Sequence, residues 1–185
     1  MVDSIWSGRP SLPRNDIYTL PIKFTGKDST AKLKEIRNEF KKIVSDEDSN
    51  QVVLLLTMLD EIAWLTNLRG SDIEFNPVFE SYAAIFSDRA ICFCHHPEAN
   101  LSQYCPDWEF HPYSEYQSFL TKLAAQESLK VWLDPTAVTM GTLMAFRDSQ
   151  VFEKESPHNF VTNSIYLISP KTGIFSPDMM SESAK

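Results

Sequence analysis

Residues 59–85 constrain the fold more than any other stretch, because their pattern changes from helix to polar turn to strand within one short segment. We expect Thr57 to cap the start of the helix as part of a capping box. The helix should run to about Leu68, where Gly70 can adopt the left-handed conformation that ends it. A strand is then expected over Val78–Phe86.

The rest of the chain alternates between strand and helix patterns. Short apolar runs predict buried strands, and apolar residues spaced three and four apart predict helices with one buried face. The expected elements are a helix at Thr30–Val44, a strand at Gln51–Leu56, a hairpin turn at Ser87–Arg89, a strand at Ala90–His95, a loop with at most a short strand over 97–112, a helix from Ser114 to about Glu127, a strand at Lys130–Asp134 and a weaker helix at Thr136–Phe146. This order predicts an α/β fold with a mixed sheet covered by helices.

Composition and charge exclude several classes of partner. Seventeen basic and 25 acidic residues give a net charge of −8, which disfavours binding to nucleic acid. The longest apolar run, Val52–Leu56, is far too short to cross a bilayer. Three cysteines, an odd number, indicate free thiols in a reducing compartment. We therefore expect a cytoplasmic protein with no role at a membrane.

The segment Cys92–His96 brings two cysteines and two histidines together, which invites a zinc interpretation. On a strand, His95 would point away from the other three side chains. Further ligands would have to come from Cys105 and His111. The plainer interpretation, which we favour, is two core thiols and loop histidines. We also find no complete motif for a nucleophile, a metalloprotease helix or a phosphate-binding loop, so we assign no catalytic and no metal-binding residue.

Arg69, Asp72 and Asn76 follow the expected helix, and two interpretations of them are open. In the structural one, Arg69 and Asp72 form a surface ion pair worth about 0–1 kcal/mol, and Trp64 joins the core. In the functional one, the turn presents these three side chains and Ser71 at a rim, since an arginine can hold a carboxylate or a peptide C-terminus by two hydrogen bonds. Trp64 would then support them from behind.

Two blocks of the chain carry a family resemblance. The first contains Val2-Asp-Ser-Ile-Trp6, Arg9-Pro10, Leu12-Pro13, Phe24-Thr25-Gly26 and Lys32-Leu33. The second and more specific block is LDEIAWLTNLRGSDIEFNPVF at residues 59–79, which Lys130-Val131-Trp132 extends weakly. Together they resemble the middle domain of the long, three-domain eukaryotic aminopeptidase P (Xaa-Pro aminopeptidase), over roughly residues 2–157.

The resemblance implies a fold of the creatinase/prolidase N-terminal type, with about six strands in a mixed sheet and a ribonuclease-H-like motif. It implies a domain at residues 22–157, after a proline-rich lead-in at 1–21 and before a divergent tail at 158–185. In this family, a separate pita-bread domain binds two manganese ions through two aspartates, one histidine and two glutamates. A metal-activated water there hydrolyses the bond that precedes proline. This chain has no counterpart of that domain, so we expect it to be inactive alone.

The function implied by the resemblance is that of a non-catalytic domain of a metallopeptidase. Such a domain would shape the substrate cleft and assist assembly, together with the catalytic domain in cis or in trans, and its substrates would be peptides with proline at the second position. Arg69, Asp72 and Asn76, with Trp64 as support, are the candidates for the cleft. The alternative is a stand-alone binding or regulatory protein without peptidase activity. A homodimer is compatible with either hypothesis.

Overall fold

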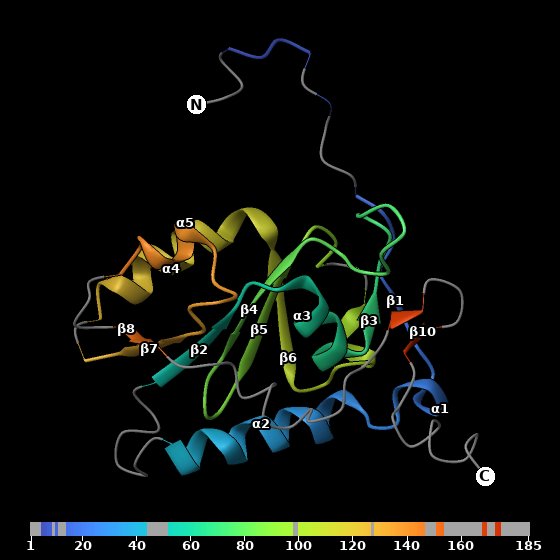
Figure 1. Ribbon diagram of the computed structural model, residues 1–185, viewed down its shortest axis with the longest axis horizontal. Coiled ribbons are helices and arrows are strands. Elements are labelled where there is room, and N and C mark those ends of the chain that lie inside the picture. The colour runs from blue at the N-terminus through green and yellow to red at the C-terminus, as the bar shows by residue number, and fades with distance from the viewer. Residues whose placement is uncertain are drawn as a thin grey trace.

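A six-stranded sheet forms the centre of the computed structural model, with helices on both of its faces (Figure 1). The structure describes residues 5–8, 10, 14–43, 52–97, 100–126, 128–146, 151–153, 168–169 and 173–174. The strands of the sheet, in spatial order, are β6 (Trp108–Pro112), β5 (Ala90–Cys94), β4 (Ser81–Ile85), β2 (Val52–Leu56), β7 (Lys130–Leu133) and β8 (Val151–Glu153). The predicted α/β class, with a mixed sheet of about six strands, is confirmed.

Strand direction decides which residues meet at each edge of the sheet. Strand β2 is parallel to β7, β7 is parallel to β8, and β5 is parallel to β6. Strand β4 lies between β2 and β5 and is antiparallel to both. The carboxyl ends of β2, β5, β6, β7 and β8 therefore meet at one edge, together with the amino end of β4. We call this edge the carboxyl edge.

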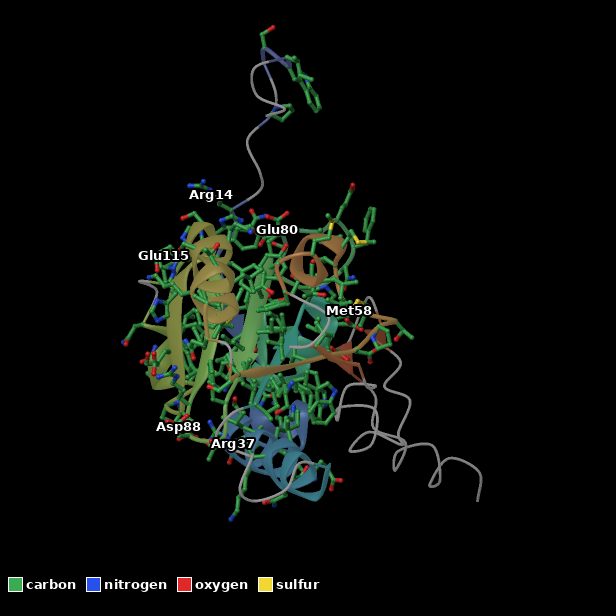
Figure 2. All side chains as sticks on the ribbon, turned by 90° about the vertical axis from the view of Figure 1, so that its left-hand side faces the viewer. Arg14, Arg37, Met58, Glu80, Asp88 and Glu115 are labelled. Atoms are coloured by element: carbon green, nitrogen blue, oxygen red, sulfur yellow. The ribbon has the colours of Figure 1, made fainter. Side chains whose placement is uncertain are left out.

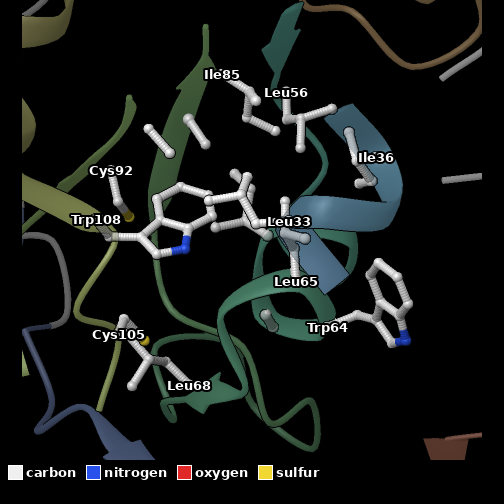
Figure 3. Close-up of a cluster of buried hydrophobic side chains, with 14 of the residues drawn as sticks. Leu33, Ile36, Leu56, Trp64, Leu65, Leu68, Ile85, Cys92, Cys105 and Trp108 are labelled. Carbon is white, nitrogen blue, oxygen red and sulfur yellow. The ribbon is translucent and has the colours of Figure 1, made fainter. Parts of the chain in front are cut away.

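Helices α2 (Ser29–Ile43) and α3 (Leu59–Thr66) cover one face of the sheet. Alternate residues of β2 point towards these helices, as in any pleated strand. Figure 3 shows the apolar side chains of this layer, which include Leu33, Ile36, Leu56, Leu65 and Trp108. A fully buried side chain of this kind stabilises the fold by roughly 1.5–3 kcal/mol relative to its exposed form. The block that carries the family resemblance thus builds much of this core layer.

The opposite face is covered by α4 (Tyr116–Ala124) and α5 (Met140–Leu143). The other residues of β2, Val53 and Leu55, belong to this second apolar layer. Tyr116 stacks on Tyr82 of β4 with a centroid separation of 3.9 Å. This aromatic contact joins α4 to the centre of the sheet close to the carboxyl edge.

Smaller elements surround the sheet. They are β1 (Tyr18–Thr19), α1 (Ile22–Thr25), β3 (Leu68–Arg69), short 3₁₀ turns at Leu101–Gln103 and Tyr113–Glu115, and the pair β9 (Ile168–Ser169) and β10 (Gly173–Ile174). Strand β1 pairs antiparallel with β3, so part of the expected lead-in lies against the domain. The expected tail at 158–185 lies outside the described residues apart from β9 and β10. Across the described ranges, no helix is both long and apolar enough to cross a membrane.

The predicted ends of α3 are wrong in an instructive way. Thr57 does not cap the helix; its hydroxyl donates to the carbonyl of Ala137 at 2.8 Å, and the N-cap position is Met58, without a side-chain cap. The helix ends at Thr66, where Asn67 adopts the left-handed conformation with φ 60°. Gly70 is required for another reason, because a Cβ at this position would lie 2.6 Å from the Cβ of Phe79.

Elsewhere the sequence pattern predicts α2 and three strands of the sheet, and it misses one strand and the length of one helix. The helix at 30–44, the strands at 51–56, 90–95 and 130–134 and the 87–89 hairpin are confirmed within one or two residues. The 97–112 segment was expected to be a loop with at most a short strand, but its last five residues form β6, an edge strand of the sheet, where proline is tolerated. The expected helix at 136–146 shrinks to the four residues of α5.

Candidate functional site

Arg69 lies inside the domain, with 3% of its surface exposed. Its guanidinium donates from Nη1 to the carbonyl oxygens of Ala63, in the last turn of α3, and of Leu68, in β3, the latter at 2.8 Å. Burial lowers the pKa of Arg69 to about 10. The expected surface ion pair with Asp72 is wrong, because Asp72 is also buried, at 9% exposed.

Lys32 is a second buried cation at the same helix end. Its Nζ donates to the carbonyl of Trp64 at 2.7 Å and to Oδ1 of Asn67 at 2.5 Å, and it lies 4.6 Å from the centroid of the Trp64 ring. Burial, together with the nearby charge of Arg69, lowers the pKa of Lys32 to about 7. Helix carbonyls and the helix dipole favour cations at this position. Trp64, 7% exposed, joins the core as the structural interpretation expected.

The burial of Lys32 was not predicted, although the sequence carries a signal for it. Ser29, Lys32, Leu33 and Ile36 follow the spacing of one helical face, and all four are buried. A lysine on the apolar face of a helix must find acceptors in the interior, since an unpaired buried charge is costly.

Asp72 connects two distant parts of the chain. Its Oδ1 accepts a hydrogen bond from the backbone N–H of Asn15 at 3.0 Å, and its Oδ2 accepts one from the backbone N–H of Glu80 at 2.9 Å. The amide of Asn15 also donates to the carbonyl of Ser71 at 2.9 Å. The carboxylate thus fixes the 14–15 segment against the residue that precedes β4.

Asn76 lies in an exposed turn that Asp72 anchors at its base. We call residues 71–77 the 71–77 turn. The N–H of Asn76 donates to the carbonyl of Ile73 at 3.1 Å, and its own carbonyl accepts from Val78 at 2.8 Å. The N–H of Asp72 donates to the carbonyl of Val78 at 3.3 Å, which closes the turn. Of the four predicted site residues, Asp72 and Asn76 share this turn, whereas Arg69 and Trp64 lie in the interior.

A hollow of about 350 Å³ opens at the carboxyl edge, where β5 and β6 end. Its lining residues are Arg14, Cys94, His95, Pro112, Tyr113 and Ser114. In Figure 2, Arg14, Glu80 and Glu115 lie at one end of the molecule, and Arg37 and Asp88 lie at the opposite end. The bonds of Asp72 to Asn15 and Glu80 join the 71–77 turn to this same end.

His95 and Tyr113 form one wall of the hollow. The Nε2 atom of His95 lies 2.9 Å from Oε2 of Glu80, and the His95 side chain is 9% exposed. The imidazole packs against the Tyr113 ring at a centroid distance of 4.5 Å, and Tyr113 stacks on Tyr82 at 5.2 Å. Burial and a hydrogen bond with Tyr82 raise the pKa of Tyr113. This wall is fixed, while Arg14 is exposed at the rim.

The hollow offers a cation, hydroxyl groups and an aromatic wall, which suit the recognition of a polar ligand or a partner surface. Cys92, Cys94 and Cys105 are buried thiols that form no disulfide, in agreement with the plainer interpretation, and Nε2 of His95 lies beside the carboxylate of Glu80. Among the described residues, no group of three or more histidine, cysteine or acidic side chains could hold a metal ion.

The sheet, its two helical layers and the carboxyl edge define a creatinase/prolidase N-terminal type of domain. A model of the Creatinase/Prolidase N-terminal domain matches residues 8–163, and the chain belongs to this family. It is 39% identical over 152 residues to Xaa-Pro aminopeptidase 1 of Dictyostelium discoideum, a match that covers 80% of this chain and 23% of the relative. It is 50% identical over 94 residues to the probable Xaa-Pro aminopeptidase P of Colletotrichum graminicola, covering 50% of this chain and 14% of that protein.

A solved structure gives the same fold. The X-prolyl aminopeptidase of Caenorhabditis elegans, described as a cytosolic enzyme with a di-nuclear active site, superposes with a TM-score of 0.72 at 24% identity. The match covers 88% of this chain and 27% of that enzyme. The resemblance to the N-terminal type of domain of aminopeptidase P is confirmed. This chain spans about a quarter or less of the length of these relatives.

Proposed function

We propose that this chain is a non-catalytic domain of a Xaa-Pro aminopeptidase and that it shapes the substrate cleft of the enzyme. Family membership supports the first part of the proposal. The observation that carries the second part is the pair of hydrogen bonds accepted by Asp72, which hold the rim of the hollow and the 71–77 turn at one end of the domain.

A rigid edge suits this role for a physical reason. Holding a substrate in the productive geometry accelerates a reaction without any catalytic group, provided that the positioning surface does not move. The stacked rings of Tyr82, Tyr113 and Tyr116 and the His95–Glu80 pair fix the wall of the hollow. Arg14 at the rim would add a positive charge where the cleft receives a peptide.

The reaction centre itself would belong to a catalytic domain, joined to this one in cis or in trans. That domain would hold two metal ions, manganese in our proposal, and would cleave peptides with proline at the second position. The unit expected at residues 22–157 would extend upstream to about Arg14, because Asn15 is bonded to Asp72 and β1 is paired with β3. We assign the protein to the cytoplasm, and a homodimer is compatible with this arrangement.

The test is the Arg14→Ala substitution in an active Xaa-Pro aminopeptidase that carries this domain. We expect kcat/KM for a peptide with proline at the second position to fall by about tenfold, which corresponds to roughly 1.4 kcal/mol of lost transition-state stabilisation. Steady-state kinetics and the melting temperature are measured together. A melting temperature close to that of the parent is expected, because Arg14 is exposed.

Arg89→Ala is the matched control. Arg89 is also an exposed arginine, but it lies in the β4–β5 hairpin at the opposite end of the strands from the hollow. Its removal should leave kcat/KM unchanged. Equal kinetics for the parent, Arg14→Ala and Arg89→Ala would remove the carboxyl edge from the cleft and refute the proposal.

A further inference from the structure

Phe75, at the tip of the 71–77 turn, is the most exposed large apolar side chain among the described residues, at 87%. Ile73, two residues before it, is also exposed. An aromatic ring in this position gains nothing from the interior of the domain. Its solvent exposure is unfavourable, since apolar surface is stabilised by removal from water.

The backbone of Phe75 is unusual as well. Its φ is +63°, in the left-handed region that glycine and asparagine adopt readily and that a bulky side chain disfavours. The next residue, Asn76, would adopt the left-handed conformation more easily, yet it is Phe75 that adopts it. Backbone strain of this kind persists where the surrounding structure imposes it, and it is frequent at functional sites.

The turn is closed across Phe75 and held at its base. The N–H of Asn76 donates to the carbonyl of Ile73 at 3.1 Å. Asp72 is held by its carboxylate bonds to Asn15 and Glu80 and by its backbone bond to Val78. Gly70 packs so closely on Phe79 that no side chain would fit between them. The ring of Phe75 is therefore displayed on a rigid support before any partner binds, which lowers the entropic cost of ordering it on association.

We propose that Phe75 is an anchor that inserts into an apolar pocket on the catalytic domain of a Xaa-Pro aminopeptidase and sets the position of this domain at the cleft. This inference rests on the proposed function. The relatives favour a catalytic domain as the partner of Phe75, because most of each relative lies outside the part that matches this chain. This chain covers only 23% of the Dictyostelium discoideum protein and 27% of the Caenorhabditis elegans enzyme. The turn shares its end of the domain with the hollow, so one partner surface could cover both. Buried aromatic anchors of this kind commonly dominate the energy of an interface.

The test separates the ring from the strain by two substitutions. Phe75→Asn removes the ring and suits the left-handed backbone, whereas Phe75→Tyr keeps both the ring and the strain. In the 185-residue chain alone, Phe75→Asn should raise Tm by roughly 2–4 °C, and Phe75→Tyr should leave it unchanged. In an active Xaa-Pro aminopeptidase that carries this domain, Phe75→Asn should lower kcat/KM by about tenfold or more and speed limited proteolysis between the domains.

Tyr104→Asn is the control for the loss of an exposed aromatic ring, since Tyr104 lies in a loop with an ordinary right-handed backbone. It should change neither kinetics nor proteolysis. If Arg14→Ala lowers kcat/KM but Phe75→Asn does not, the anchor is refuted and the proposed function stands. If neither substitution has an effect, both fail. A change in the oligomeric state of the isolated chain on Phe75→Asn would assign the ring to a contact between two copies and would also overturn the inference.

Discussion

Two regions of this domain contain basic side chains, which are buried in one region and exposed in the other. At the end of α3, Lys32 and Arg69 are enclosed, and each donates a hydrogen bond to a carbonyl in the last turn of the helix. At the carboxyl edge, Arg14 is exposed beside a hollow whose wall is already paired and stacked. The difference teaches that an arginine beside a predicted turn does not indicate a binding site until the acceptors of its hydrogen bonds are known.

Trp64→Ala should have the largest effect on the enclosed region. The indole is buried and packs against Lys32. Its removal leaves a cavity and takes away the aromatic ring that lies against the ammonium group of Lys32. We expect the free energy of unfolding to fall by about 3–5 kcal/mol in urea titrations. Trp6→Ala, at an exposed tryptophan, should change it by less than about 0.5 kcal/mol. A similar small effect for Trp64 would contradict its place in the core.

Arg69→Ala should lower the free energy of unfolding by about 2–3 kcal/mol, because the carbonyls of Ala63 and Leu68 lose a buried donor. The functional interpretation of the sequence placed Arg69 at an open rim, where its removal would hardly change the melting temperature. Thermal unfolding of Arg69→Ala and Arg14→Ala, measured side by side, decides between these expectations. Equal melting temperatures for the two variants would erase the contrast between the regions.

The enclosed lysine should also make stability depend on pH. Burial holds the pKa of Lys32 at about 7 in the folded protein, against 10.5 as its ordinary value. Between these values the unfolded chain binds a proton that the folded chain has released, so the free energy of unfolding rises with pH, by at most about 1.4 kcal/mol per pH unit. Cys105, whose pKa burial raises to about 11 from 9.0, acts in the opposite direction above pH 9.

Urea unfolding at pH 7, 8 and 9 isolates the contribution of Lys32. Lys32→Met should flatten the slope, and Lys34→Met, at an exposed neighbour on the same helix, should retain it. An unchanged slope in Lys32→Met would mean that other groups cause the dependence.

The smallest effect on stability is expected for Ser114→Ala in the lining of the hollow. Ser114 is exposed, so the free energy of unfolding should stay within about 0.5 kcal/mol of the parent. Its hydroxyl would nevertheless be available to a ligand in the cleft. In an active aminopeptidase that carries this domain, we expect a modest rise in KM, by a few-fold, with an unchanged kcat, as for uniform binding. A fall in kcat alone would contradict that role.

The fold was largely predictable because the main helices and strands have clear hydrophobic patterns in the sequence. The continuous apolar run of β2 predicts a strand buried on both faces, and the spacing of the apolar residues in α2 predicts its buried face. The end of α3 was not predictable, since Asn67 and Gly70 both suit a left-handed turn and only the contact between Gly70 and Phe79 distinguishes their roles.

The candidate site was harder to predict, because it depends on long-range contacts. The hollow brings together His95 and Tyr113, which follow the parallel strands β5 and β6, and Arg14, which lies some 80 to 100 residues earlier in the chain. The segment that carries Arg14 is held there by the bonds of Asn15 to Asp72 and Ser71. Asp72 was identified, but as a surface group, because no local pattern reveals that its acceptors serve Asn15 and Glu80. The sequence therefore identified the family segment at residues 59–79 correctly, but not the positions of Arg69 and Asp72 within the fold.

The bond between Asp72 and Asn15 bears on where this protein can be cut for expression. A recombinant version that starts at residue 22, the boundary expected from sequence, would discard β1, Arg14 and the N–H that Oδ1 of Asp72 accepts. In such a shortened polypeptide β3 would lose its partner strand and become an open edge. Oδ1 of the buried Asp72 would lose its protein donor and would depend on water for a hydrogen bond. Versions intended for crystallisation or binding assays should therefore start upstream of Arg14.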